Sequence, residues 1–421
     1  MAAVRTLMQT SVPLWNHNWS WSEPFGGAPL LPFVAMHDRS IDVILTNQRG
    51  EGFVKQVFIA VLGGCAQSPD RAPTVIDIGS NTGYYSMMAA AHRCEVFAVD
   101  AQPGCRQWFE AARAANDANA SQVGAQHFSR QKVRIITRPV ANSDKPIEID
   151  ANSCWVMHKA DVRVARAVPS GRVAAVPLGS DELLGLLPSA SPILLAKVDV
   201  EGAELGVLAV LWPLLGRMSN LVVELAPGWW PLFTHTNRSR TFATRRVDMR
   251  RQRKEGKTPQ EKIVRIVGSG DGRSALELSE HEVARVRNNG ASTVARLLRP
   301  AAEGGGGFRA ALTSAGRLFT SADKMHAYVV NMGGNGYWNQ EDMWFAKDLS
   351  DIRRARRLIC LRRQSHQSES TARRQCESHR GGAVSRAGQG RAGQGRAGQG
   401  RHSKRGGGVG REGRRPEQTR V

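Results

Sequence analysis

Two short segments of the sequence combine acidic side chains with glycines, a composition suited to binding a nucleotide-like cofactor or moving a proton. Residues 77–84 read DIGSNTGY, and residues 196–204 read AKVDVEGAE. A short apolar run precedes each segment, and a helix-like apolar run follows it. Both segments therefore fit the end of a buried strand, which is where parallel sheets place their ligands.

The first segment predicts a cofactor-binding turn. A strand ends in Asp77, and Gly79 and Gly83 let the backbone approach a ligand closely because neither carries a Cβ atom. The spacing is G-x-x-x-G with Asn81 inside it, whereas a dinucleotide fingerprint needs G-x-G-x-x-G. This favours S-adenosylmethionine, which has no pyrophosphate, over a nicotinamide or flavin cofactor. Tyr84 follows the turn and is expected to face the cofactor. The alternative is a structural turn without a ligand.

An acid also closes the next predicted strand. Residues 95–100 read EVFAVD and end in Asp100, 23 residues after Asp77. An acid at about this distance can accept hydrogen bonds from both ribose hydroxyls of a nucleotide. We therefore predict that Asp100 binds the cofactor, with a solvated turn residue as the alternative.

The second segment supplies candidate catalytic groups. In an extended strand Lys197, Asp199 and Glu201 would lie on one face and converge on a single site. We predict that Asp199 orients the acceptor or the sulfonium, that Glu201 accepts a proton, and that Lys197 holds a negative oxygen or pairs with an acid. The alternative is an ion network at the start of the helix that contains Glu204. The acids offer too few ligands to argue for a metal ion, and none is predicted.

Short apolar runs alternate with helical patterns through the middle of the chain. This order predicts an α/β fold of the Rossmann-like, doubly wound type, with a mostly parallel sheet covered by helices on both faces. The expected strands are residues 74–78, 95–100, 133–137, 193–199 and 220–225, with one more beginning at 148. The expected helices are residues 84–92, 107–119 and 204–215.

These motifs resemble the FkbM family of S-adenosylmethionine-dependent methyltransferases. Residues 77–85 are similar to the family's D-x-G-x-N-x-G-Y-Y opening, and residues 197–204 match its K-x-D-x-E-G-x-E signature without a gap. The resemblance covers residues 38–224 well and the remainder to 347 loosely. The family often ends its second strand in Glu followed closely by Pro, whereas this chain has Asp100, whose reach is shorter, and then Pro103.

The resemblance implies a seven-stranded class I methyltransferase sheet, S-adenosylmethionine as the cofactor, and O-methylation of a hydroxyl group. It also implies that Asn142, in a segment similar to the one after the family's third strand, belongs to the cofactor site. The acceptor is expected to be a small molecule, a glycan or a lipid. The alternative from another class is a catalytically inactive Rossmann-like scaffold that binds RNA or anionic surfaces through its basic segments.

Composition divides the chain into three regions. Residues 1–35 are expected to be an irregular lead-in rich in Trp and Pro, and residues 36–349 the methyltransferase-like domain, with a basic surface insertion at 234–258. Residues 350–421 form a low-complexity tail in which RAGQG occurs three times. Such a repeat cannot bury a core, so we expect the tail to be disordered, with an artefact of gene prediction as the alternative.

The net charge of +21 is concentrated in the tail. Residues 353–421 hold 19 Lys and Arg against 4 acidic residues. We expect this tail to make non-specific contacts with anionic partners. The sequence shows no transmembrane segment and no secretory signal, which favours a cytoplasmic location.

The six cysteines form no C-x-x-C pair. Their spacing suits neither a zinc site nor a disulfide scaffold. We predict that they are buried small hydrophobic residues in a reducing compartment. The positions are Cys65, Cys94, Cys105, Cys154, Cys360 and Cys376.

Overall fold

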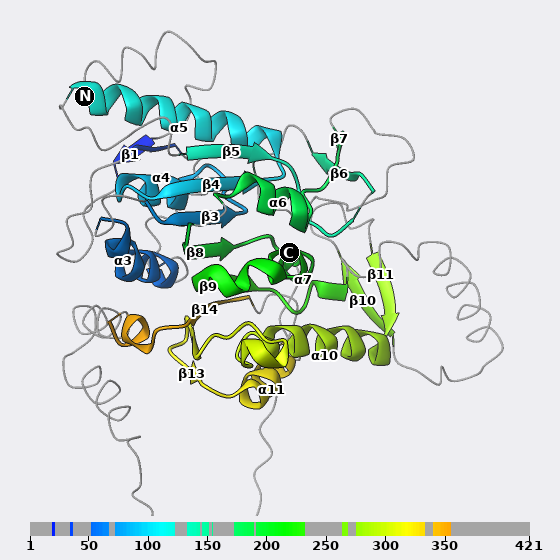
Figure 1. Cartoon of the computed structure of the whole chain (residues 1–421). Helices are drawn as coiled ribbons and strands as arrows, with labels where there is room; N and C mark the ends of the chain where they lie inside the picture. The colour runs from blue at the N-terminus through cyan, green and yellow to red at the C-terminus, as the bar shows by residue number, and fades with distance from the viewer. Residues whose placement is uncertain are drawn as a thin grey trace, which may run out of the picture. The chain divides into compact units, whose positions relative to one another are not determined.

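A mixed sheet of eight strands, in the order β13-β12-β14-β9-β8-β3-β4-β5, forms the centre of the folded region (Figure 1). The computed structural model describes residues 19–21, 34–36, 52–66, 72–122, 133–143, 145–150, 154, 172–188, 191–231, 263–267, 275–332 and 340–354. The predicted basic insertion at 234–258 lies outside these residues, as do the RAGQG repeats. None of the described helices combines the length and apolar character that crossing a membrane requires.

Five neighbouring strands of this sheet are parallel, as predicted. Their arrows point the same way in Figure 1, so their carboxyl ends share one edge. The strands β4 and β5 have the bounds expected from the sequence. The five are β3 (Thr74–Ile78), β4 (Glu95–Asp100), β5 (Val133–Thr137), β8 (Ile193–Val198) and β9 (Met218–Leu225).

The other three strands extend the sheet beyond β9 in the antiparallel sense. They are β12 (Ala310–Thr313), β13 (Leu318–Phe319) and β14 (Glu341–Ala346). The expectation of seven strands was therefore wrong by one. Because β14 runs opposite to β9, its first residues lie beside the carboxyl end of β9. This places residues from near the end of the domain at the edge where the parallel strands stop.

Alternating residues of the strands enter two separate hydrophobic clusters, which confirms that the sheet is covered on both faces. Val75 of β3 belongs to one cluster and Ile76 to the other, because successive strand residues point to opposite sides. The first face is covered by α3 (Gly52–Ala66), α4 (Tyr84–Ala91) and α5 (Pro103–Gln122). The second is covered by α6 (Ser180–Leu186), α7 (Glu204–Leu211), α10 (Glu280–Arg296) and α11 (Ala322–Met332).

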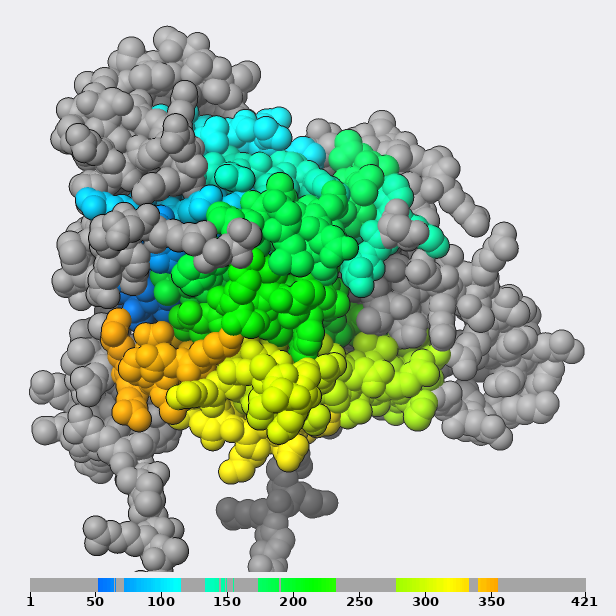
Figure 2. Space-filling model, viewed as in Figure 1, coloured from blue at the N-terminus to red at the C-terminus, as the bar shows by residue number. Residues whose placement is uncertain are grey.

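Figure 2 shows how the segments adjoin on one side of the molecule. The cyan segments border the green ones, and the green segments border the yellow and orange ones. This sequence of colours follows the order of the sheet from β5 toward its antiparallel end.

Smaller elements change three of the sequence expectations. The lead-in contains β1 (Trp19–Trp21), which pairs with β2 (Val34–Met36), so it is not irregular throughout. The strand expected to begin at 148 is β6 (Ile147–Asp150), which pairs with β7 (Arg172–Ala175) outside the main sheet. The helix expected to end at 215 stops at Leu211 and continues as the 3-10 helix η2 (Trp212–Arg217), which has a proline in its first turn.

The structure also describes an antiparallel pair, β10 (Ile263–Val267) and β11 (Ala275–Ser279), and the 3-10 helix η4 (Ala301–Glu303).

The folded region extends past the predicted domain boundary at 349. Residues 349–354 are helical, the side chain of Ile352 is buried, and Arg354 donates a hydrogen bond to the carbonyl oxygen of Ala60 in α3. The predicted tail therefore begins at least five residues too early. Residues 355–421 lie outside the described part of the chain.

Four cysteines form two disulfides, so the prediction of reduced cysteines was wrong for these four. Cys65 at the end of α3 is joined to Cys94 just before β4. Cys105 in the first turn of α5 is joined to Cys154, which follows β6. Sequence spacing did not show this because each bridge connects elements that meet only when helices pack on the sheet. Disulfides persist mainly in oxidising compartments, so the cysteines no longer support a reducing one.

We expect Cys94→Ser to lower the free energy of unfolding by about 3–4 kcal/mol, because the Cys65–Cys94 bridge closes a loop across 29 residues. The measurement is denaturant unfolding without a thiol reductant. Cys65→Ser and the double variant should lose the same amount, since all three remove one bond. Additive losses in the double variant would show that the two sulfurs are not bonded.

Candidate active site at the carboxyl ends of the parallel strands

Asp77 and Lys197 are direct neighbours on the adjacent strands β3 and β8. Both side chains are buried, at 0% and 5% exposure, and Lys197 Nζ lies 3.7 Å from Asp77 Oδ1. Ser86 Oγ donates a hydrogen bond of 2.6 Å to Asp77 Oδ2. Burial raises the pKa of Asp77, and the charge of Lys197 opposes that rise. The two segments identified in the sequence therefore meet through a buried ion pair.

Lys197 has further partners on both segments. Its ammonium group donates to Asp199 Oδ2 at 3.0 Å and to the carbonyl oxygen of Gly79 at 3.3 Å, and it lies over the ring of Tyr85. A buried lysine with these contacts is placed to hold the turn and the carboxylates together. Pairing with an acid is one of the two roles predicted for Lys197, and direct contact of Lys197 with a substrate stays a prediction.

The glycine turn directs its backbone amides into the protein. The amides of Gly79 and Ser80 donate to the carbonyl oxygen of Val99 at the end of β4, and the amide of Gly83 donates to that of Ser80. The amide of Asn81 donates to Asp100 Oδ2 at 2.8 Å. A pyrophosphate-binding loop presents such amides to its ligand instead. This turn is therefore unlike a dinucleotide cradle, as its spacing predicted.

Packing against protein atoms explains why glycine is required at both ends of the turn. Gly79 and Gly83 have φ angles of 77° and 84°, which favour glycine. A Cβ atom on Gly79 would lie 1.7 Å from the carbonyl oxygen of Asp199, and one on Gly83 would lie 2.3 Å from the ring of Phe109. The sequence predicted a ligand in these spaces. In the structure they are filled by the turn after β8 and by α5.

Asp100 lies at the end of β4, where the sequence placed it. Its carboxylate accepts one hydrogen bond from the amide of Asn81 and one of 2.8 Å from the amide of Gln102. Burial raises the pKa of Asp100 to about 6 despite these two amide donors. Each carboxylate oxygen can accept a second hydrogen bond, which leaves room for ribose hydroxyls. Contact of Asp100 with a ribose stays a prediction.

Two buried hydroxyl groups at the same edge fit a polar ligand. Ser80 Oγ in the turn and Thr137 Oγ1 at the end of β5 have no hydrogen-bond partner among the described residues. Buried polar atoms are rarely left in this state, because each unsatisfied group costs about 1–3 kcal/mol. A nucleoside lying across these strand ends would supply partners, so the residues present fit a cofactor of that class.

The other two predicted cofactor residues lie near this edge with different surroundings. Tyr84 begins α4, and its ring packs beneath the ammonium group of Lys55 and against the ring of Tyr85. Asn142 is exposed on the loop after β5. For both residues, contact with a cofactor stays a prediction.

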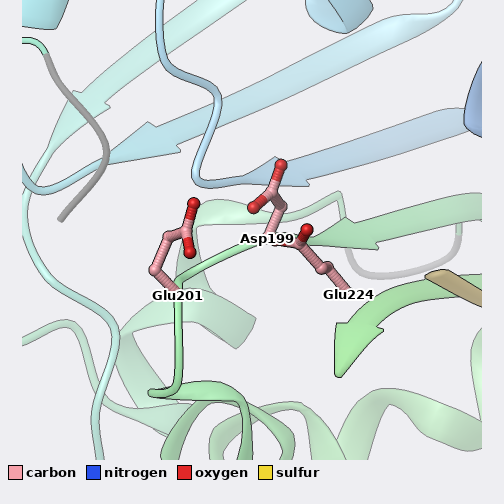
Figure 3. A group of neighbouring side chains, drawn as sticks. All are labelled: Asp199, Glu201 and Glu224. Atoms are coloured by element: carbon pink, nitrogen blue, oxygen red, sulfur yellow. The ribbon is translucent and has the colours of Figure 1, made fainter. Parts of the chain in front are cut away.

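Three carboxyl groups converge beside this turn. Asp199, Glu201 and Glu224 each offer an oxygen atom, and these atoms lie within 4.8 Å of one another (Figure 3). The sequence predicted that Asp199 and Glu201 come together, but as neighbours on one strand face. Instead β8 ends at Val198, and Glu201 adopts a positive φ of 51° in the turn that follows. The turn, and not the strand, brings Glu201 to Asp199.

Two residues of this cluster were missed in the sequence. Glu224 is the last residue but one of β9, so an acid near a strand end was a signal that the sequence offered. Gln340 donates a hydrogen bond of 2.6 Å to Glu201 Oε2. Gln340 belongs to neither motif, and its place depends on the antiparallel pairing of β14 with β9.

The three carboxyl groups differ in protonation. Burial raises the pKa of Asp199, but the charge of Lys197 and a hydrogen bond from Glu224 outweigh it, so the net shift is downward. Burial and then the charge of Asp199 raise the pKa of Glu201 to about 8. The same two causes raise the pKa of Glu224 well above its ordinary value. At neutral pH, Asp199 is therefore the ionised member of the cluster.

These protonation states account for the close approach of the carboxyl groups without a metal ion. Lys197 already pairs with Asp199, and protons reduce the charge of the other two groups. We assign no metal to this cluster.

Glu204 begins α7 and is completely buried. It accepts hydrogen bonds from the amide of Gly202 and, at 2.7 Å, from Trp230 Nε1. Burial raises the pKa of Glu204 to about 7 against these donors. Glu204 thus fixes the turn that carries Glu201.

Comparison with known proteins adds little to this geometry. No protein-family model matches the chain, and no curated protein matches it. The FkbM resemblance therefore rests on the motifs alone.

Among solved structures, the chain is similar at 13% identity to magnesium protoporphyrin IX methyltransferase (ChlM) from Synechocystis PCC 6803 with bound SAH, over 72% of this chain and 86% of that one, with a TM-score of 0.25. It is similar at 15% identity to a SAM-dependent methyltransferase from Agrobacterium tumefaciens, over 62% and 67%, with a TM-score of 0.24. It is also similar at 15% identity to WbdD, over 43% of this chain, with a TM-score of 0.21. The match spans only 29% of the length of WbdD. Likenesses at these TM-scores carry no argument, so the fold class rests on the sheet topology itself.

We expect Gly79→Ala to lower the free energy of unfolding by about 3 kcal/mol or more, because its Cβ atom would overlap the backbone of Asp199 at a positive φ angle. Thermal unfolding measures the loss. Gly206→Ala is the matched control, since Gly206 lies on the exposed side of α7 with nothing within 4 Å of its Cβ position. The control should be neutral or slightly stabilising. Equal behaviour of the two variants would contradict the close approach of the two turns.

We expect the folded protein to lose stability as the pH rises from about 5 to about 8. The pKa values of Glu201 and Glu204 are about 8 and about 7 when folded, against an ordinary value of 4.5, so the folded state binds more protons than the unfolded state in this range. The stabilisation is fully present below pH 4.5, the ordinary pKa of glutamate, and it is lost as the pH rises through the pKa values of the folded state. Melting temperatures measured across this range test the expectation, and the double variant Glu201→Gln, Glu204→Gln should show a weaker decline.

Proposed function

We propose that this chain is an S-adenosylmethionine-dependent methyltransferase that transfers the methyl group to a hydroxyl oxygen. The observation that carries the proposal is the position of Lys197, whose buried ammonium group joins the glycine turn to Asp199 of the carboxyl cluster. A binding turn and a proton-accepting group therefore lie at one edge of a Rossmann-like sheet. The FkbM-like order of the two motifs supports the same assignment.

The geometry of the turn favours this cofactor over a dinucleotide. Four of its amides are bonded to the protein, which leaves them unavailable to a pyrophosphate. The unsatisfied hydroxyls of Ser80 and Thr137 and the carboxylate of Asp100 favour a nucleoside with several polar groups. Within this proposal Gly79, Asn81 and Gly83 shape the turn, and Asp100 binds the ribose.

The residues of the cluster can remove the proton of an acceptor hydroxyl. When bound, S-adenosylmethionine supplies a methyl group activated by its sulfonium. Transfer of that methyl group to the acceptor oxygen, with cleavage of the carbon–sulfur bond, would leave S-adenosylhomocysteine as the second product. Glu201, oriented by Gln340, takes the hydroxyl proton in its ionised form. Asp199 stays ionised beside Lys197 and orients the acceptor.

The acceptor follows from the resemblance and not from contacts in the structure. We propose a hydroxyl group on a small molecule, a glycan or a lipid. The inactive scaffold remains the alternative function. Its basic segments lie outside the described residues, so no observation favours it.

We expect the full-length protein to bind S-adenosylmethionine saturably, and Asp100→Ala to weaken binding at least tenfold, about 1.4 kcal/mol, through loss of the ribose contact. Isothermal calorimetry measures both affinities. Glu110→Ala is the control, because this side chain on α5 is 41% exposed and pairs with Arg106, and it should bind as the unmodified protein does. Absence of binding by a folded protein would remove the methyltransferase proposal and favour the scaffold.

We expect the rate of methyl transfer to rise with pH along a limb centred near pH 8, because Glu201 has a pKa of about 8 and must be ionised to take a proton. Glu201→Gln should lose about 100-fold or more in kcat, and this limb should disappear. Transfer of labelled methyl groups to a panel of hydroxyl acceptors measures both. Retention of the limb in the variant would assign the base to another group.

A further inference from the structure

The carboxyl group of Glu224 lies at a position that neither the motifs nor the proposed mechanism uses. Glu224 is next to the last residue of β9, and β9 pairs with β8 through Val198 and Val223. The next residues along the chain are Asp199, just after β8, and Glu224 in β9. Figure 3 shows Asp199 between the other two, with Glu224 on one side and Glu201 on the other.

We propose that Glu224 is a positioning residue that keeps a proton and donates it in a hydrogen bond to Asp199, fixing the carboxylate of Asp199 between Glu224 and Lys197. Lys197 Nζ bonds to Asp199 Oδ2 at 3.0 Å from one side. Glu224 offers a carboxyl oxygen within 4.8 Å of one of Asp199, and the proposed hydrogen bond joins these two groups. Asp199 is thereby restrained by the two strands that flank it in the sheet.

The surrounding charges determine which carboxyl group keeps the proton. Asp199, Glu201 and Asp342 all place negative charge near Glu224, and Asp342 faces it directly across the β9–β14 ladder. Lys197, the basic partner of the cluster in the described part of the chain, bonds directly to Asp199. Ionising Asp199 therefore costs less than ionising Glu224, and burial of Glu224 strengthens this preference.

This arrangement has a consequence for the chemistry of Glu201. The ionised Asp199 raises the pKa of Glu201 toward neutrality, which suits a general base better than an ordinary carboxylate does. If Asp199 were free to rotate or to take the proton itself, both this effect and the orientation of the acceptor would be lost. The proposed role of Glu224 in catalysis rests on the proposed function, but the position of its proton does not.

Infrared spectroscopy of the full-length protein at neutral pH tests the proton directly. A protonated carboxyl group has a C=O stretch separate from that of a carboxylate, and Glu224→Gln should remove one such band. Glu303→Gln, at an exposed position on η4, should remove none. Loss of no protonated band in Glu224→Gln would overturn the proposal. Loss of the wild-type band on adding magnesium or calcium would also overturn it, because the cluster would then be a cation site.

A pair of variants separates positioning from packing. Gln at position 224 keeps a donor toward Asp199, whereas Leu of similar size has none, so Glu224→Leu should lower kcat about 10- to 100-fold while Glu224→Gln restores most of it. Melting temperatures of both variants confirm that they fold. Equal losses in the two variants would overturn the positioning role. If the unmodified protein binds no S-adenosylmethionine, the proposed function fails, and the infrared result still decides where the proton lies.

Discussion

The buried contacts of Lys197 are the constraint on which the rest of the site depends. One ammonium group with almost no exposure contacts two acids and a backbone carbonyl from two different crossovers of the sheet. Removing one partner from such a group costs about 3–5 kcal/mol, because a charge is left buried without compensation. The turn after β3 and the turn after β8 are therefore held together whether or not a ligand is present. The two turns lie so close together that a Cβ atom added to Gly79 would be 1.7 Å from the carbonyl oxygen of Asp199.

Residues from the antiparallel end of the sheet complete the carboxyl cluster at the edge where the parallel strands end. A parallel sheet brings together only residues that follow its strands, and those here are mostly acids. The strand β14 runs in the opposite direction. Gln340, just before it, and Asp342, near its start, therefore lie at the edge where the parallel strands end. Gln340 then bonds to Glu201, and Asp342 adds negative charge beside Glu224. The protonation of the cluster is thus set jointly by both halves of the sheet.

A disulfide contacts the glycine turn after β3 from the side of α5. Cys154 Sγ lies 3.3 Å from Asn81 Oδ1, and Cys105 is completely buried in the first turn of α5. A disulfide sulfur carries no proton, so this is a packing contact and not a hydrogen bond. The bridge connects the segment after β6 to the helix that follows β4. Asn81, which adopts a positive φ of 51°, is therefore bounded by Asp100 through its amide and by the bridge through its side chain.

The sequence by itself determined the parallel strands, the helices between them and the two turns at which the site forms. It could do so because a buried strand followed by glycine and acid is a local pattern, and the bounds of β4 and β5 were recovered from it residue by residue. It also identified Asp77, Asp100, Asp199 and Glu201 as residues of one edge. Only the tertiary structure decided that Lys197 is buried between Asp77 and Asp199, that Glu224 and Gln340 join the cluster, and that four cysteines pair. Each of these depends on which strand or helix lies beside which, and that information is not present in the spacing of residues along the chain.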